Sequence, residues 1–155
     1  LLVDSLMFGL LVSLTLFCAR RWDCEELRGI HYLMRGALAL RNRCAHGASV
    51  LTTLAPRYHA RREVDDGIVR ELARAGISRR RRQARLRNAG TCDITTLLFL
   101  HSRLAPEDYP RRRSAARLHD MFDRAAVHRD WYGIRHPLTY SMKFIEEAAY
   151  AFGFG

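Results

Sequence analysis

The stretch DCEELRGIHYLMRGALALRNRCAHG, residues 23–47, carries the helical pattern on which the expected fold of this 155-residue chain depends. Asp23 is placed to cap the helix, and Glu26 falls three residues later, as a capping box requires. Gly47 follows the pattern directly, where a helix commonly ends on a left-handed residue. We therefore predict a helix that begins after Asp23 and ends at about His46.

Two faces of this helix follow from a rotation of about 100° per residue. Arg41 falls in the middle of an apolar face formed by Leu27, Ile30, Met34, Ala37, Leu38 and Ala45. A buried, unpaired guanidinium is costly, so we expect Arg41 to meet an anion, an acceptor or a partner chain. An adjacent polar strip contains Arg28, Arg35, Asn42 and His46. The pattern thus predicts an arginine, an amide and an imidazole together at one helix end.

The remaining chain also favours helices, and no segment shows a convincing two-residue alternation typical of a strand. Caps, glycines and prolines place further helices at about Val3–Arg20, from Asp65/Asp66 to Gly76, and at Asp93–Leu104, Pro110–Val127 and Leu138–Phe152. We expect an all-α fold, a bundle of about five to six helices forming one domain over residues 1–155. The chain begins with Leu rather than Met, and we expect it to be N-terminally incomplete.

Positive charge is concentrated in one part of the chain, whose formal net charge is +10. Residues 57–87 carry eleven Arg against four Asp and Glu, and the whole sequence has 25 Arg but one Lys. Guanidinium groups suit bidentate contact with phosphate, so a polyanionic partner is one interpretation. The alternative is a solvated basic loop without a partner. We expect residues 77–90 to form such a basic loop or a frayed helix.

The N-terminal segment and the cysteines bear on the location of the protein. Residues 1–19 are strongly apolar and about as long as a membrane span, but Asp4 lies inside them and no basic residue precedes them. A buried core helix explains the segment better than a membrane helix. The four cysteines form no CxxC pair and have no metal-site spacing. We expect reduced thiols, a cytoplasmic protein and no bound metal or other cofactor.

The order of two motifs gives a resemblance to a known family. Ser5-Leu6-Met7-Phe8-Gly9 precedes Arg41-Asn42-Arg43-Cys44-Ala45-His46, and the second motif resembles the R-x4–6-H motif of HEPN domains. The pair resembles the Abi-like branch, which is linked to abortive phage infection. Residues 94–104, followed by Pro106, also resemble a later apolar helix of that family. Gly47-Ala48-Ser49 departs from it, because members often carry a second His and a basic or aromatic stretch there.

The resemblance implies an all-helical, HEPN-like endoribonuclease of toxin or antiphage type that needs no metal. In such an enzyme the ribose 2′-OH attacks the adjacent phosphorus and leaves a 2′,3′-cyclic phosphate. His46 would act as general base or acid, Arg41 would stabilise the transition state, and Asn42 would orient the reacting groups. The family also implies a homodimer through the Arg41–His46 helix, and an antitoxin or regulatory partner.

RNA contacts are expected along the polar strip and the basic segment. The candidate residues are Arg28, Arg35, Arg43, Arg79, Arg80, Arg81, Arg82, Arg85 and Arg87. Three other interpretations remain open: a non-catalytic HEPN-type module that binds RNA or a partner, a membrane-anchored helical protein, and an unrelated helical protein with an Arg-rich loop.

Overall fold

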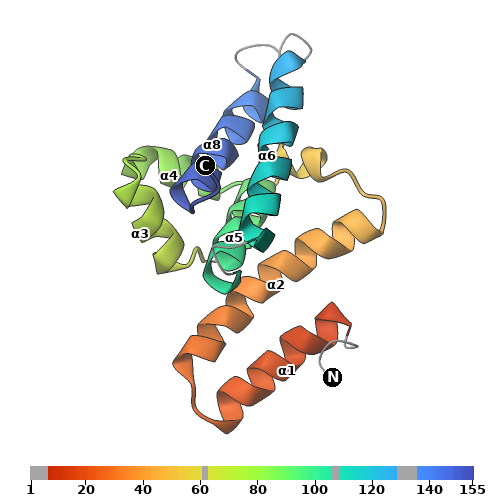
Figure 1. The fold of residues 1–155 in the computed structure, drawn as a ribbon, viewed down its shortest axis with the longest axis vertical. Helices are drawn as coiled ribbons and strands as arrows, with labels where there is room; N and C mark the ends of the chain where they lie inside the picture. Colours follow the sequence, from red (N-terminus) through yellow and green to blue (C-terminus); the bar gives the residue numbers. More distant parts are fainter. Residues whose placement is uncertain (1–6, 61–62, 106–108, 129–135) are drawn as a thin grey trace.

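A computed structural model describes residues 7–60, 63–105, 109–128 and 136–155 of the chain. Within these ranges the chain is all-α, and the only β-type pairing is an isolated bridge between His59 and Asn88. The elements, shown in Figure 1, are α1 (Phe8–Arg21), α2 (Glu25–Ala45), a short 3-10 helix η2 (Val50–Leu54), α3 (Asp66–Arg74), α4 (Arg79–Leu86), α5 (Ala89–Leu104), α6 (Tyr109–Val127) and α8 (Pro137–Ala151). The predicted all-α class is confirmed, but the described residues contain seven α-helices where about five to six were expected.

Helix α2 is packed between α1 and α5. α1 and α2 form an antiparallel hairpin, which lies at the lower side of Figure 1. Its two helices are joined by buried polar contacts: the His31 ring nitrogen Nδ1 lies 3.0 Å from the Val12 carbonyl, and the Thr15 hydroxyl lies 3.6 Å from the Met34 sulfur. On its other side α2 meets α5, so the hairpin is anchored to the rest of the bundle through α2.

The hydrophobic core is completed by α3, α5, α8 and η2. Its largest fully buried side chains include Phe144, Phe154, Leu54, Ile68 and Leu72. Helix α6 has no fully buried residue, but Ala115, Leu118 and Phe122 pack against the core, and polar contacts add to this packing. Its Ser114 hydroxyl lies 2.9 Å from His101 Nε2, and His119 Nε2 lies 3.1 Å from the Phe154 carbonyl.

The junction between η2 and α5 depends on Asn88 and Gly90, which are two positions apart in the chain. Asn88 caps α5, and its Oδ1 accepts from the Thr91 N–H at 2.9 Å and the Thr91 hydroxyl at 3.0 Å. Its Nδ2 donates to the Ala55 carbonyl at 2.8 Å and the Tyr58 carbonyl at 3.2 Å. A Cβ at Gly90 would lie 2.8 Å from the Thr53 carbonyl carbon, so only glycine allows this close approach.

Several expected boundaries are confirmed and others need correction. Gly76 ends α3 in a left-handed conformation, and Asp65 caps the same helix, both as predicted. The capping box at Asp23 is wrong: Cys24 is the N-cap of α2, and Asp23 has a positive φ of 47° and binds Arg28 instead. Helix α5 begins four residues before the expected Asp93, because Asn88 supplies the cap.

The basic loop predicted over residues 77–90 is also wrong. Ser78 caps a helix over Arg79–Leu86, and α5 then begins at Ala89. Leu86 is buried and anchors α4 to the core. Packing against α3 and α5 stabilises α4 despite its dense positive charge.

The core-helix interpretation of residues 1–19 holds for one face of α1 only. Residues 1–6 lie outside the described residues. Val12 and Ala19 are buried, whereas Met7, Leu10 and Phe17 are 73%, 52% and 62% exposed and form an apolar stripe along the outer face. Across the part of the chain that the structure describes, no helix combines the length and the apolar character that crossing a membrane requires.

Replacing Asn88 with Ala removes its four side-chain hydrogen bonds at the junction between η2 and α5. We expect the free energy of unfolding to fall by about 1–3 kcal/mol, because the buried Thr91 loses its acceptor and two backbone carbonyls lose their donor. Urea denaturation followed by circular dichroism measures the change. Ser78→Ala, which removes one longer cap bond of 3.4 Å, is the control, and we expect a smaller loss. Equal losses for the two variants would contradict the role given to Asn88.

Candidate functional site

The end of α2 is fixed by a glycine that the sequence identified. Gly47 has φ of +66°, and its N–H donates to the Cys44 carbonyl at 3.1 Å. The Ala48 N–H donates to the Arg43 carbonyl at 3.0 Å, which completes a Schellman motif. His46 is consequently the C-cap residue, and its N–H donates to the Asn42 carbonyl at 3.0 Å. The backbone therefore holds His46 one turn after Asn42.

Arg41 is exposed, and the prediction that it lies within a buried apolar face is wrong. The buried stripe of α2 ends one residue earlier: Leu33, Met34, Ala37 and Leu40 are at most 8% exposed. None of residues 41–49 is buried, and Ala45, which was also expected on the apolar face, is exposed. The last turns of α2 extend beyond the other helices at the right of Figure 1, which explains why no residue there is buried.

The structure brings two of the three predicted site residues into contact. The Arg41 guanidinium donates to the Asn42 amide oxygen at 3.1 Å. His46 is exposed, and among the described residues no hydrogen bond joins its ring to Arg41 or Asn42. Five positions separate it from Arg41, which corresponds to about 140° around the helix axis. Asn42 therefore lies between the guanidinium on one side and the imidazole on the other.

The polar strip of α2 is only partly available to a ligand. Arg28 binds the carboxylates of Asp23, at 3.2 Å, and Glu25, so its charge is already compensated. Arg35 is exposed, and Arg43 is half-buried near the end of the helix. Arg35 and Arg43 thus retain the capacity for anion contact that was predicted for the whole strip.

The arginines of α4 and its C-terminal edge divide into two groups. Arg81 binds Glu147 with an N–O distance of 2.7 Å, Arg82 donates to the Ile77 carbonyl, and Arg85 lies 5.1 Å from the centre of the Tyr140 ring. These three are half-buried and hold α4 in place. The other three, Arg79, Arg80 and Arg87, are exposed, and no ion pair to a described residue is recorded for them.

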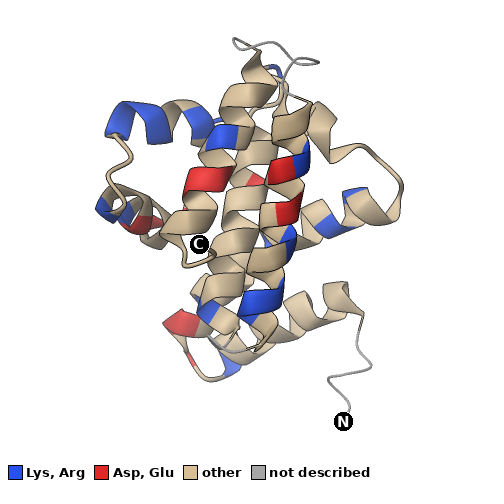
Figure 2. Ribbon diagram, turned by 45° about the horizontal axis from the view of Figure 1, so that its top comes forward, with Lys and Arg blue, Asp and Glu red and all other residues tan. Residues whose placement is uncertain are grey.

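The two basic regions lie on different sides of the molecule. α4 is at the left and the end of α2 at the right in both Figure 1 and Figure 2, where the Arg-rich ribbon of α4 is blue. Charge at α4 therefore cannot act directly on a phosphate held at His46 of the same chain. A long polyanion would have to span both regions.

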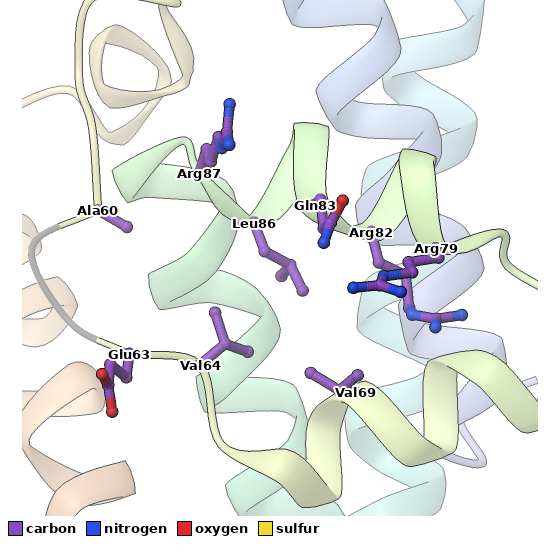
Figure 3. A pocket seen from close by; sticks show the side chains of 9 residues that line it. All are labelled: Ala60, Glu63, Val64, Val69, Arg79, Arg82, Gln83, Leu86 and Arg87. Atoms are coloured by element: carbon purple, nitrogen blue, oxygen red, sulfur yellow. The ribbon is translucent and has the colours of Figure 1, made fainter.

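Sequence patterns did not reveal a pocket between α3 and α4. It has a volume of about 550 Å³ and is lined by Val64, Val69, Leu86, Gln83 and several arginines (Figure 3). The available signal was Ser78 as a helix cap with Leu86 eight residues later, which together would have indicated a helix with one apolar anchor.

Comparison with protein-family models, with curated proteins and with solved structures finds no match to this chain. Among the described residues, no group of three or more His, Cys, Asp or Glu side chains is arranged to hold a metal ion.

Because the end of α2 is exposed, its side chains contribute little to folding. We expect Arg41→Ala and His46→Ala each to change the free energy of unfolding by less than about 0.5 kcal/mol. Thermal and urea unfolding of the two variants test this expectation against Leu40→Ala, which removes a buried side chain at the same helix end and should cost about 2–5 kcal/mol. A large loss at Arg41 would instead indicate a buried role for its guanidinium.

Proposed function

We propose that this chain is a metal-independent endoribonuclease of HEPN type, acting through Arg41, Asn42 and His46. One observation carries the proposal: the exposed end of α2 presents an Arg41 guanidinium bound to the Asn42 amide, and Asn42 lies one turn before the exposed imidazole of His46. No ion pair to a described carboxylate is recorded for Arg41, so its charge is available to a phosphate.

The chemistry of these groups suits transesterification of RNA. The ribose 2′-oxygen forms a bond to the adjacent phosphorus while the bond to the 5′-oxygen breaks. His46 takes the proton of the 2′-OH or supplies one to the leaving 5′-oxygen, because an imidazole can both accept and donate a proton. Arg41 stabilises the charge that grows on the phosphorane oxygens. The products are a 2′,3′-cyclic phosphate and a 5′-OH.

A second copy of the chain belongs to this proposal. The reaction needs a base and an acid, and one α2 end offers one imidazole. A guanidinium open to bulk water is also strongly screened, and a partner surface would strengthen its field. The apolar stripe of α1 supports such a partner, since α1 packs directly on α2 and leaves Met7, Leu10 and Phe17 uncovered in the described chain.

The cellular role follows from the resemblance. A cytoplasmic toxin or antiphage nuclease, restrained by an antitoxin or regulatory partner, is the role that we propose for this activity. The second candidate is a non-catalytic RNA-binding module, which the exposed Arg79, Arg80 and Arg87 favour because phosphate contacts alone give affinity.

Cleavage separates the two functions. We expect the purified chain to cut RNA in the presence of EDTA and to leave cyclic-phosphate ends. His46→Ala and Arg41→Ala should each reduce the rate by about 10²- to 10⁴-fold. His59→Ala and Arg70→Ala change an exposed histidine and an exposed arginine outside α2, and they should leave the rate unaltered.

The same variants can be scored by toxicity on expression. Cleavage that persists in His46→Ala would place the catalytic site elsewhere, and RNA binding without cleavage by the unaltered chain would favour the non-catalytic module.

The proposed dimer is tested at α1. Phe17→Glu puts a charge on the apolar stripe, and we expect it to convert a dimer to a monomer and to lower the cleavage rate in parallel. Sedimentation velocity measures the mass. Val127→Glu is the matched control, since Val127 is 75% exposed on α6, away from the hairpin. A fully active monomer would exclude the composite site.

A further inference from the structure

The pocket between α3 and α4 combines an apolar floor with cationic groups at one end. Figure 3 shows Leu86 of α4 pointing toward Val64 and toward Val69 of α3, which lie opposite. The side chains of Arg79 and Arg82 lie next to each other at one end of this floor, and Glu63 lies at the other. Arg87 also belongs to the lining, so the single carboxylate of the lining does not compensate the three guanidinium groups.

Arg82 is fixed in the pocket wall by a backbone carbonyl. Its Nη1 donates to the Ile77 carbonyl, which fixes the side chain, but its buried Nε has no hydrogen-bond partner among the described residues. The Nη1 bond holds the Arg82 guanidinium at the pocket wall, where its remaining N–H groups can donate to an anion. Arg79 beside it is exposed and can approach the same anion from the solvent side.

We propose that this pocket binds one nucleotide of single-stranded RNA, with the base against Val64, Val69 and Leu86 and the phosphate at Arg79 and Arg82. The inference rests on the proposed function, because it takes RNA as the ligand. A volume of about 550 Å³ suits a small ligand rather than a duplex. Base edges need hydrogen-bonding partners, and the Gln83 amide lies at the rim, where it can supply a donor and an acceptor.

The pocket differs from a plain basic surface in what it requires of the ligand. A phosphate alone satisfies the arginines, whereas the apolar floor gains only from a base. Arg80 is the internal comparison: it is exposed, adjacent in sequence to Arg79 and absent from the pocket lining. Arg81 cannot replace Arg79 at the phosphate, because the Arg81 guanidinium already forms an ion pair with Glu147.

The test measures binding in the full chain carrying His46→Ala, so that cleavage does not consume the probe. Fluorescence anisotropy with a labelled oligouridine at fixed salt gives the affinity. We expect Arg79→Gln and Val69→Phe, which fills the floor without changing charge, each to weaken binding by about three- to tenfold. Val64→Phe is the second filling variant in case Val69→Phe does not fold. Arg80→Gln should have a clearly smaller effect.

Competition identifies the part of the ligand that is recognised. We expect uridine monophosphate to displace the probe at lower concentration than inorganic phosphate, and single-stranded RNA to bind more tightly than the same sequence as a duplex. Equal effects of Arg79→Gln and Arg80→Gln, with none from either filling variant, would overturn the pocket, as would equal competition by inorganic phosphate. Binding of the free nucleotide as tightly as the oligonucleotide would also overturn the proposal, because the site would then not be specific for a nucleotide within a strand.

Failure of this inference is distinct from failure of the nuclease proposal. RNA held in the pocket by a chain that never cleaves would support the pocket and reject the enzyme. Cleavage that depends on His46 but ignores both filling variants would reject the pocket alone.

Discussion

The packing of α2 between α1 and α5 is the constraint from which the rest of the molecule follows. Leu33, Met34, Ala37 and Leu40 bury one stripe of α2, and His31 joins the helix to the Val12 carbonyl of α1. Because this stripe ends at Leu40, the next turn leaves the core and carries Arg41 and Asn42 into solvent. Gly47 then stops the helix within two turns. The candidate site thus begins where α2 leaves the core. Its side chains are available to a ligand because they take no part in the packing of the fold.

A different rule governs the arginines of α4. Three of the five are used by the fold itself, through Glu147, the Ile77 carbonyl and the Tyr140 ring. These contacts tether a helix whose composition alone gives it little reason to pack, and Leu86 provides its buried anchor. The exposed members therefore lie on a rigid support and not on a loop. A fixed guanidinium loses less conformational entropy on binding an anion than one on a moving segment, which favours recognition at α4 over loose electrostatic attraction.

Local sequence signals predicted where helices occur and end. They did not predict which neighbouring helices cover each face. Gly47, Gly76 and the Asp65 cap mark helix ends through their own backbone geometry, so they could be identified without knowledge of any neighbour. Arg41 could not be placed in this way, because a helical wheel gives the direction of a side chain but not the point at which the packed neighbours end. The capping box predicted at Asp23 was wrong for a related reason. Arg28 forms ion pairs with Asp23 and Glu25, and these contacts compete with the capping box. The pocket beside α4 was missed because it needs α3 and α4 together.

The geometry at the end of α2 also limits how any chemistry there can work. Asn42 is the one residue that connects the two reactive groups, since its carbonyl fixes the His46 backbone and its amide oxygen holds the Arg41 guanidinium. The guanidinium and the imidazole nevertheless point about 140° apart around the axis, so one α2 end cannot close around a single phosphodiester by itself. Two ends facing each other remove this difficulty, because the arginine of one and the histidine of the other can then approach the same phosphorus from opposite sides. An α2 end that protrudes from its own bundle, next to an α1 face left apolar, is the arrangement in which such pairing costs least.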